Sequence, residues 1–410
     1  MADFQQARSI TTLHRLGEPD LEWLEGQLQD YSRRRPVALV LPCLFSELEG
    51  EAIHGIVAEL RRIPYISHIV LSMDRMNADQ FQMAARFFSQ LPQEHRILWH
   101  DGPRMRGLVA ELEEAGLAVG EQGKGRGSWF AFGYVIGMGR ARVIALHDCD
   151  ILTYRRDLLA RLCFPVMNPS MGYEFCKGYY ARYRDQLYGR VTRLFVTPLL
   201  RALMVLTGGH PILDYLDSFR YPLAGEFAVS VDLAQNTRIP ADWGLEIGML
   251  TEVYRNVSMK RICQVDLAEN YEHKHRPLSP RNPERGLMKM AIDIADSILR
   301  TLAGEGVQMG RAFFRTLSTL YERMAEDTIR SYNDDALINK LHFDRHAENQ
   351  AVETFRRGLQ IAGTNFLEDP HGSLLIPSWI RVTAAIPDFT ERLVAAVEAD
   401  YQEVRAAVSG

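Results

Sequence analysis

Two aspartates, one residue apart, follow an apolar run of strand length. Asp148 and Asp150 come directly after residues 142–146, Arg-Val-Ile-Ala-Leu, with His147 between the run and the first carboxylate. In an extended chain residues i and i+2 point to the same side, so the two carboxylates can converge on one cation. Their oxygens suit Mg²⁺ or Mn²⁺, and such an ion could hold a diphosphate. The alternative is that both residues only cap a following turn or helix.

A glycine-rich basic turn lies shortly before the same strand. Residues 122–129 read Gln-Gly-Lys-Gly-Arg-Gly-Ser-Trp and lead into a helical pattern. Backbone amides at a helix start, together with Lys124, offer a phosphate-binding surface. The turn lacks the Gly-Lys-Ser/Thr ending of a Walker loop, so a simple glycine hinge is the other interpretation.

Three further segments carry polar groups of interest. Residues 173–184 alternate aromatic and basic side chains, which suits either an anion pocket or an edge strand with a solvated face. Glu246 is expected to begin a helix, where a carboxylate in the first turn is stabilising. His273 belongs to a His-x-His pair after the strand-like run 262–267 and is a candidate third metal ligand. A solvated pair with no ligand is its alternative.

The elements that must position these groups alternate between strand and helix. Strand-like runs occupy residues 36–44, 67–73, 95–100 and 142–146, with helical patterns over 48–63, 78–91 and 105–117. This alternation predicts a parallel sheet covered by helices. Ligands of such sheets bind outside the carboxyl ends of the strands. Loops 42–47, 72–75 and 148–150 are therefore expected to share one crevice.

Composition sets the outer limits. The chain has 410 residues, 47% hydrophobic and 24% charged, with a net charge of -5, which disfavours a general nucleic-acid binder. Its five cysteines are scattered, without a Cys-x-x-Cys pair, so a disulfide framework or structural zinc site is not expected. Neither a secretory signal nor an apolar run of about 18 residues is found. We therefore expect a cytoplasmic protein that does not span a membrane.

A chain of this length is expected to have more than one structural part. We predict an N-terminal extension over 1–35, a catalytic domain over 36–280 and a C-terminal helical region over 281–410. Amphipathic patterns at about 283–304, 308–331, 346–363 and 386–407 support the helical region. Its expected work is packing on the core, self-association into a homodimer, or both. Loss of residues from about 310 onward is therefore expected to disturb assembly or solubility more than chemistry.

Seven short blocks occur in an order that is more specific than any one of them. In this order the chain resembles the retaining nucleotide-sugar transferases that make glucosyl-3-phosphoglycerate or mannosyl-3-phosphoglycerate. The match covers roughly residues 36–300. The blocks are Leu-Pro-Cys-Leu at 41–44, Gly-Lys-Gly at 123–125, Asp-Cys-Asp at 148–150, Gly-Arg-Val-Thr at 189–192, Pro-Leu-Ala-Gly-Glu at 222–226, Trp-Gly-Leu-Glu-Ile-Gly at 243–248 and His-Lys-His-Arg-Pro-Leu at 273–278.

The resemblance implies an α/β protein of the GT-A type, with an open mixed sheet flanked by helices and a C-terminal helical extension. It also implies transfer of a hexose, with glucose favoured, from a nucleoside diphosphate sugar to the 2-hydroxyl of 3-phosphoglycerate, with the anomeric configuration kept. Mg²⁺ or Mn²⁺ would be held by Asp150 and His273. It would neutralise the charge that develops on the leaving diphosphate.

The same resemblance assigns roles to individual residues. Asp150, Glu246 and Arg190 would carry the chemistry, and no covalent nucleophile is assigned. The donor would be bound by Pro42, Cys43, Leu44, Ser46, Ser72, Lys124, Asp148 and Glu246. Gly225 and Glu226 would line the same pocket. The acceptor would be bound by Gly189, Arg190, Thr192 and His275, since the planar guanidinium of an arginine grips an anion with several donors.

Departures from the family pattern leave the donor open. Phe45-Ser46-Glu47 stands where the family often has Asn-Glu-Glu, and Trp243 replaces a frequent tyrosine. UDP-glucose and a GDP-linked hexose such as GDP-mannose both remain candidates.

Two other classes of protein are alternatives. One is a sugar-phosphate nucleotidyltransferase, although its glycine-rich signature normally lies in the first strand-to-helix loop, where this chain has Pro-Cys-Leu-Phe. The other is a non-catalytic sugar-nucleotide binder.

Overall fold

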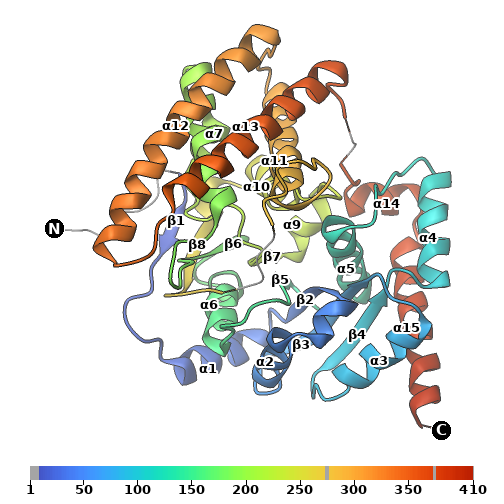
Figure 1. The fold of residues 1–410 in the computed structure, drawn as a ribbon. Coiled ribbons are helices and arrows are strands. Elements are labelled where there is room, and N and C mark those ends of the chain that lie inside the picture. The colour runs from blue at the N-terminus through green and yellow to red at the C-terminus, as the bar shows by residue number, and fades with distance from the viewer. Residues whose placement is uncertain (1–8, 273–276, 373–374, 410) are drawn as a thin grey trace.

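An eight-stranded sheet forms the centre of the molecule (Figure 1). The computed structural model describes residues 9–272, 277–372 and 375–409. The strands lie in the order β1-β8-β6-β7-β5-β2-β3-β4. Their bounds are β1 Thr11–Leu13, β2 Val37–Leu44, β3 Ile66–Asp74, β4 Glu94–Trp99, β5 Val143–Leu146, β6 Phe175–Tyr180, β7 Phe227–Ser230 and β8 Ile262–Ala268.

The four strands predicted in the first half of the chain are confirmed. β2 pairs in parallel with β3 and β5, and β3 pairs in parallel with β4. Pro42 lies opposite Ser72, and Val40 lies opposite Leu146, so these strands end at the same edge of the sheet. Their aliphatic side chains are buried, as expected for parallel strands covered on both faces.

Helices cover both faces of this part of the sheet. The connecting helices are α2 Glu51–Leu60, α3 Ala78–Phe88, α4 Pro103–Glu114 and α5 Lys124–Met138. α3 begins with a capping box between Asn77 and Gln80, which satisfies two backbone amides at the helix start. α5 is buried along most of its length and packs against β2 and β3.

The other half of the sheet is mixed. β7 runs antiparallel to both β5 and β6, whereas β6 and β8 are parallel. Every residue of β6 is buried, and the strand lies between β7 and β8. The alternative that residues 173–184 form a solvated edge strand is therefore wrong. α6 Arg156–Met167 packs on β6 and β8.

The first 35 residues add to the sheet. β1 pairs in parallel with β8 and forms one edge of the sheet, while α1 Leu21–Ser32 packs against α6. The strand is only three residues long, and its sequence carries no alternation that would predict it.

Between β6 and β8 the chain forms a group of short helices. They include a π-helical turn, η2, which is a wider turn than an α-helix makes and is often found at functional sites. Two short 3₁₀ turns, η1 after β2 and η3 directly before β8, complete the set. The bounds are η1 Phe45–Glu49, η2 Val191–Val196, α7 Thr197–Thr207, α8 Pro211–Asp217, α9 Val231–Asn236, α10 Leu245–Asn256 and η3 Met259–Arg261.

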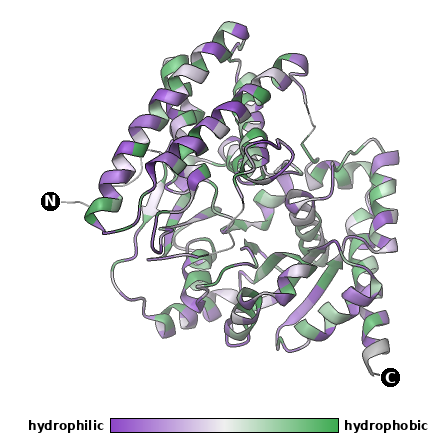
Figure 2. Cartoon of the chain, viewed as in Figure 1, coloured by the Kyte–Doolittle hydropathy of each residue, from purple (hydrophilic) through white to green (hydrophobic). Residues whose placement is uncertain are grey.

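The last third of the chain is helical, as predicted. α12 and α13 form a long antiparallel pair whose residues alternate between hydrophilic and hydrophobic along each helix (Figure 2). α14 was not predicted; its Trp379 stacks on Trp129 of α5 with ring centroids 4.0 Å apart. The bounds are α11 Gly286–Gly304, α12 Arg311–Ile338, α13 Arg345–Glu368, α14 Trp379–Ala385 and α15 Phe389–Ser409.

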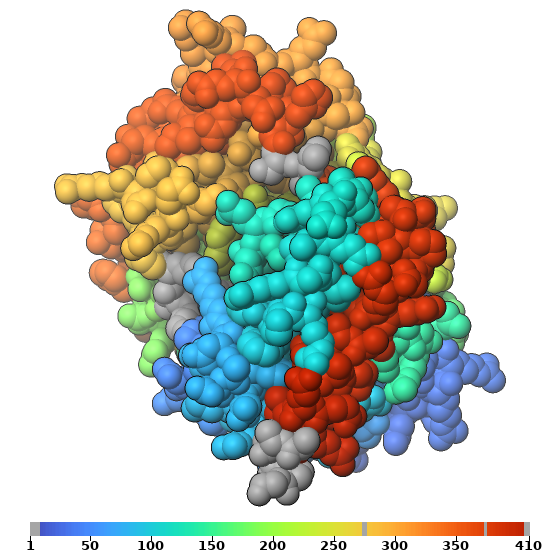
Figure 3. Space-filling model, turned by 90° about the vertical axis from the view of Figure 1, so that its right-hand side faces the viewer, coloured from blue at the N-terminus to red at the C-terminus, as the bar shows by residue number. Residues whose placement is uncertain are grey.

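The C-terminal helix returns to the first half of the sheet. α15 packs against α3, α4, α5 and β4, and Figure 3 shows its red surface beside the cyan residues of α4. Arg96 of β4 donates to Glu398 of α15 at 2.8 Å, and Tyr134 of α5 donates to the same carboxylate at 2.9 Å.

Within the described ranges, no helix has both the length and the apolar composition needed to cross a bilayer. All five cysteines are buried and free.

Candidate active site

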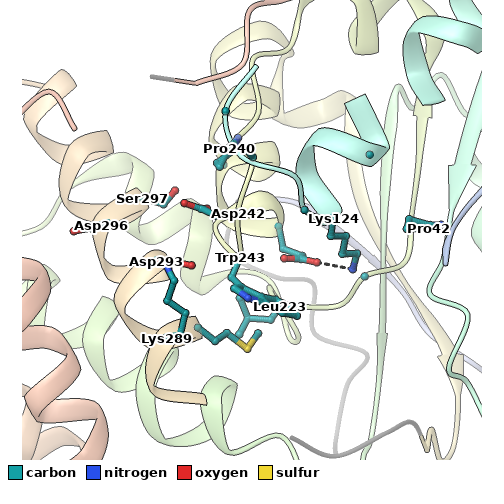
Figure 4. Close-up of a pocket in the computed structure, with 18 of the residues that line it drawn as sticks. Pro42, Lys124, Leu223, Pro240, Asp242, Trp243, Lys289, Asp293, Asp296 and Ser297 are labelled. Carbon is teal, nitrogen blue, oxygen red and sulfur yellow. Dashed lines mark hydrogen bonds and ion pairs between the residues drawn. The ribbon is translucent and has the colours of Figure 1, made fainter. Parts of the chain in front are cut away.

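A cleft of about 1650 Å³ opens at the edge where β2, β3 and β5 end. Its opposite wall is built by the start of α10, by α11 and by residues between α13 and α14 (Figure 4). The shared crevice predicted from the strand ends is therefore present. Of the predicted site residues, Pro42, Cys43, Leu44, Ser72, Lys124, Asp148, Asp150, Gly189, Arg190, Thr192 and Glu246 all line it.

Lys124 is the first residue of α5 and forms two ion pairs in the cleft. Its Nζ lies 2.7 Å from Asp148 Oδ1 and 2.9 Å from Glu246 Oε1. Burial alone lowers the pKa of Lys124, but these two carboxylates outweigh it, so the pKa is raised. The lysine stays charged and joins the end of β5 to the start of α10.

Asp148 lies close against the backbone of Gly225. A Cβ at position 225 would lie 2.5 Å from Asp148 Oδ2, closer than any side-chain carbon can come. The glycine in the turn before β7 is therefore required by this close approach.

The second aspartate is a chemically suitable cation ligand. Burial and the neighbouring Asp148 raise the pKa of Asp150 to about 7, and Glu47 and Glu226 act in the same direction. A divalent cation would oppose this repulsion, and carboxylate oxygens are its preferred donors. The residues present thus fit Mg²⁺ or Mn²⁺.

The described part of the chain does not supply a full coordination set. It contains no cluster of three or more His, Cys, Asp or Glu side chains arranged to hold a metal ion. The other predicted ligand, His273, and the predicted acceptor residue His275 lie outside the described residues.

The loop after β2 differs in detail from the prediction. Ser46 is exposed and does not line the cleft, whereas Glu47 does. The reason is local: η1 turns directly after β2 and directs alternate residues to different sides.

A second group of polar residues lies where β3 and β4 end. Ser72 Oγ lies 2.8 Å from His100 Nε2, and burial lowers the pKa of this histidine. Gln122 donates to Asp74 at 2.8 Å and to Asp101 at 3.1 Å. Asp74 belongs to the predicted loop 72–75 and Gln122 to the predicted glycine-rich turn, although neither was assigned a role; His100, at the end of a predicted strand, was not predicted.

The segment before η2 forms another part of the wall. Gly189 has a φ of +74°, a conformation that favours glycine, and Arg190 and Thr192 follow it into the cleft. Arg190 Nε donates to Glu348 Oε1 of α13 at 2.7 Å. Thr192 Oγ1 is buried and makes no hydrogen bond to the described residues.

Glu226 does not line the cleft, contrary to the prediction. It is fully buried beneath it, where Tyr180 donates to Oε2 at 2.8 Å and Tyr271 donates to Oε1 at 2.5 Å. Burial raises the pKa of Glu226, and the two tyrosines work against that rise. The residue supports the site from below.

The α11 wall carries residues that the sequence did not indicate. Asp242, Trp243, Lys289 and Asp293 face one another across part of the cleft (Figure 4). Lys289 Nζ lies 2.6 Å from Asp293 Oδ1, and burial together with Asp242 raises the pKa of Asp293 to about 6. In sequence Lys289 and Asp293 belong to an ordinary amphipathic helix, so no local pattern marks them, whereas Asp242 and Trp243 lie just before α10 and Trp243 belongs to one of the seven blocks.

Solved structures of known proteins show a similar fold. A crystal structure of glucosyl-3-phosphoglycerate synthase from Mycobacterium tuberculosis, in complex with Mn²⁺, UDP-glucose and phosphoglyceric acid, superposes with a TM-score of 0.54 at 20% identity. The match covers 72% of this chain and 88% of that one. The chain therefore has the fold of that synthase, an open mixed sheet flanked by helices, as predicted.

Sequence comparison leads to a particular family. Glucosyl-3-phosphoglycerate synthase from Persephonella marina is 50% identical over 403 residues, covering 98% of this chain and 100% of the relative. The synthase from Methanococcoides burtonii is 38% identical, covering 98% of each. The chain belongs to the family of glucosyl-3-phosphoglycerate synthases and is a glycosyltransferase. It matches no protein-family model.

Proposed function

We propose that this protein transfers glucose from UDP-glucose to the 2-hydroxyl of 3-phosphoglycerate, with the anomeric configuration kept. The observation that carries the proposal is one cleft that joins an acidic strand end, bridged by Lys124, to an arginine-bearing segment at Gly189–Thr192. The first can hold a nucleoside diphosphate sugar, and the second can hold a small anion. Full-length identity to two synthases supports the choice of substrates.

Donor binding is assigned to the strand ends. Pro42, Cys43, Leu44 and Ser72 would hold the nucleoside, with the pair Asp74–Gln122 beside them. Glu246, fixed by Lys124, would accept hydrogen bonds from hydroxyls of the sugar. Lys124 keeps a positive charge beside the diphosphate and would stabilise it as the glycosidic bond breaks.

A divalent cation would be held by Asp150, with His273 as the proposed second ligand. When bound, Mg²⁺ or Mn²⁺ supplies Lewis-acid stabilisation of the departing diphosphate. Lys124 adds a fixed positive charge beside Asp148.

Acceptor binding is assigned to Gly189, Arg190 and Thr192, with His275 as a further proposed contact. Arg190 offers a planar donor set to the carboxylate or phosphate. The hydroxyl of Thr192, which has no hydrogen-bond partner among the described residues, adds a single donor. We assign no covalent nucleophile.

The test is a donor panel. The protein is incubated with Mg²⁺, 3-phosphoglycerate and, separately, UDP-glucose, GDP-glucose and GDP-mannose, and the released nucleoside diphosphate is measured. Release of UDP with formation of a glucosylated phosphoglycerate supports the proposal. Preference for GDP-mannose would change the donor, pyrophosphate formed from a sugar phosphate and UTP would indicate a nucleotidyltransferase, and no release with any donor would overturn transfer.

We further propose that the protein acts in the cytoplasm as a homodimer. Five free buried cysteines suit a reducing compartment. Light scattering after size-exclusion chromatography tests the dimer: a mass near twice 46.7 kDa supports it, and a mass near 46.7 kDa contradicts it.

A further inference from the structure

Glu348 of α13 is a buried carboxylate shared by two arginines. It is 3% exposed, and its Oε1 accepts from Arg190 Nε at 2.7 Å. Its Oε2 accepts from Arg193 at 3.0 Å. A charge held this far from water is costly unless it is paired, and here each oxygen has an arginine.

Arg193, which is held by Glu348, also hydrogen-bonds the backbone of the cleft wall. Its Nε donates to the carbonyl of Tyr188 at 2.7 Å, and a terminal nitrogen donates to the carbonyl of Leu187 at 3.3 Å. Both carbonyls lie directly before Gly189. Glu348 therefore fixes the side chain of Arg190. Through Arg193 it also fixes the main chain of the two residues before Gly189.

The hairpin of α12 and α13 makes further contacts with the same segment. The backbone amide of His342, in the turn between the two helices, donates to Asp185 O at 2.7 Å. Tyr321 Oη of α12 donates to Leu194 O of η2 at 2.8 Å. The guanidinium of Arg193 lies 4.7 Å from the ring centre of Tyr332. The segment from 185 to 194 is thus fastened from one side by the C-terminal helical region.

We propose that Glu348 is a positioning residue for the acceptor, and that the α12–α13 hairpin is the scaffold of the acceptor site. This inference rests on the proposed function. Glu348 occupies Nε of Arg190, and the two terminal nitrogens of Arg190 make no hydrogen bond within the described residues. They are left for an anion that carries a carboxylate or a phosphate. Because one carboxylate serves two guanidiniums, the group keeps a net positive charge.

The experiment removes the negative charge of Glu348 but keeps the size and shape of its side chain. In Glu348→Gln, Arg190 loses its fixed orientation, so the KM for 3-phosphoglycerate is expected to rise ~10- to 100-fold. The KM for UDP-glucose should stay within about twofold, because the donor residues stand on other elements. Glu353→Gln is the matched control: it lies on the same helix, where Glu353 pairs with Arg356 near the surface, and should change neither constant.

A second variant covers the case in which Glu348→Gln does not fold, since it leaves the buried Arg193 and the half-buried Arg190 without a counter-charge. Arg193→Gln combined with Glu348→Gln removes one charge of each sign and restores the balance. It should fold, as judged by circular dichroism, and still show the selective rise in acceptor KM.

A cycle with Arg190→Lys separates positioning from general packing. If Glu348 acts through Arg190, the double variant should be little worse than Arg190→Lys alone. Equal changes in both KM values, or independent effects in the cycle, would overturn the inference. Unchanged acceptor KM in an active variant would overturn it while leaving the proposed function intact; a wild type that does not glucosylate 3-phosphoglycerate would remove both.

Discussion

Lys124 controls the charge balance of the cleft at the scale of single residues. It bridges two carboxylates that stand 122 and 24 positions away in sequence, Glu246 and Asp148. Without it, an acidic wall would face a diphosphate. Lys124 therefore holds the two carboxylates in place before the reaction and stabilises the negative charge that develops during it.

Lys124→Met should reduce kcat by about 10²- to 10³-fold, the usual loss when one fixed electrostatic contact to a transition state is removed. Initial rates at saturating substrates measure it. Lys260→Met, at an exposed position in η3, is the control and should behave as wild type. A Lys124→Met rate within threefold of wild type would show that the lysine has only a structural role.

Metal removal provides a second residue-scale prediction. EDTA should abolish turnover, and added Mg²⁺ or Mn²⁺ should restore it in the wild type. Asp150→Asn should stay inactive after the metal is added back, because an amide is a much weaker cation ligand than a carboxylate. Binding of Mn²⁺ with UDP, followed by calorimetry, should be lost in parallel. Near-normal turnover of the variant would place the ion elsewhere.

His68, which is buried and does not line the cleft, is expected to make the stability of the protein depend on pH. Burial lowers its pKa from 6.5 to about 4, so the unfolded state binds its proton first as the pH falls. The neutral His68 makes its full contribution to the free energy of unfolding above pH 6.5, and this contribution is lost progressively as the pH falls to 4. Between pH 7.5 and pH 5 the free energy of unfolding falls by about 2 kcal/mol through His68.

Urea unfolding at the two pH values measures this term. In His68→Gln the free energy of unfolding should fall less between pH 7.5 and pH 5, by about 2 kcal/mol, than in the wild type. Comparing the two slopes cancels the titration of other buried groups. Identical slopes would mean that His68 does not titrate in this window.

At the scale of elements, the strand ends and the turn before β7 assemble the cleft. β5 delivers Asp148 and Asp150, and the turn at Gly225 lies directly against the first of them. Parallel pairing of β2 with β3 and β5 places their ends at one edge, which is a property of the sheet and not of any one loop.

Gly225→Ala should damage activity more than stability. The added Cβ would lie 2.5 Å from Asp148 Oδ2, so that carboxylate must move and its ion pair with Lys124 is disturbed. We expect at least a tenfold loss of kcat/KM, on the order of the ~1.4 kcal/mol that a displaced contact costs. Thermal unfolding should shift little.

Gly26→Ala is the matched control. Gly26 is exposed within α1, and a Cβ there would meet nothing within 4 Å. The variant should keep full activity and gain about 0.5–1 kcal/mol of stability from the better helix propensity of alanine. If both variants lose activity alike, close packing at Gly225 is not the cause.

At the scale of the whole molecule, the C-terminal helices are part of the catalytic body. The sequence predicted that losing residues from about 310 onward would disturb assembly or solubility more than chemistry. The structure contradicts the basis of that prediction. Glu348 contacts Arg190, and α15 buries Phe389, Leu393 and Val397. The cleft is also lined by Pro370, His371, Leu375 and Pro377.

Truncation at residue 310 should therefore yield a protein that does not fold cooperatively. Burying large apolar side chains contributes roughly 1.5–3 kcal/mol each, and several such residues would be exposed on α5 and β4. Circular dichroism and a thermal melt measure the outcome. A soluble truncated protein with a sharp melt and wild-type turnover would show that the helices are dispensable.

Much of the fold was determined by sequence alone. The four leading strands, their helices and the helical tail are visible as local periodicity, because burial on one face or both leaves a mark on neighbouring residues. The ordered blocks placed most of the cleft residues as well, since strand ends of a parallel sheet must meet. Ser46 and Glu226 were misplaced because a 3₁₀ turn and a buried support look like any loop in sequence.

Only the tertiary structure decided which distant side chains pair. Arg190 and Glu348 are 158 positions apart, and nothing in the periodicity of α13 distinguishes Glu348 from the solvent-facing glutamate five residues later. Local patterns report what a residue needs from its own element, whereas an ion pair depends on how two elements are packed. Most of the residues that line the cleft could thus be predicted from the sequence, but not the ion pairs that hold them in place.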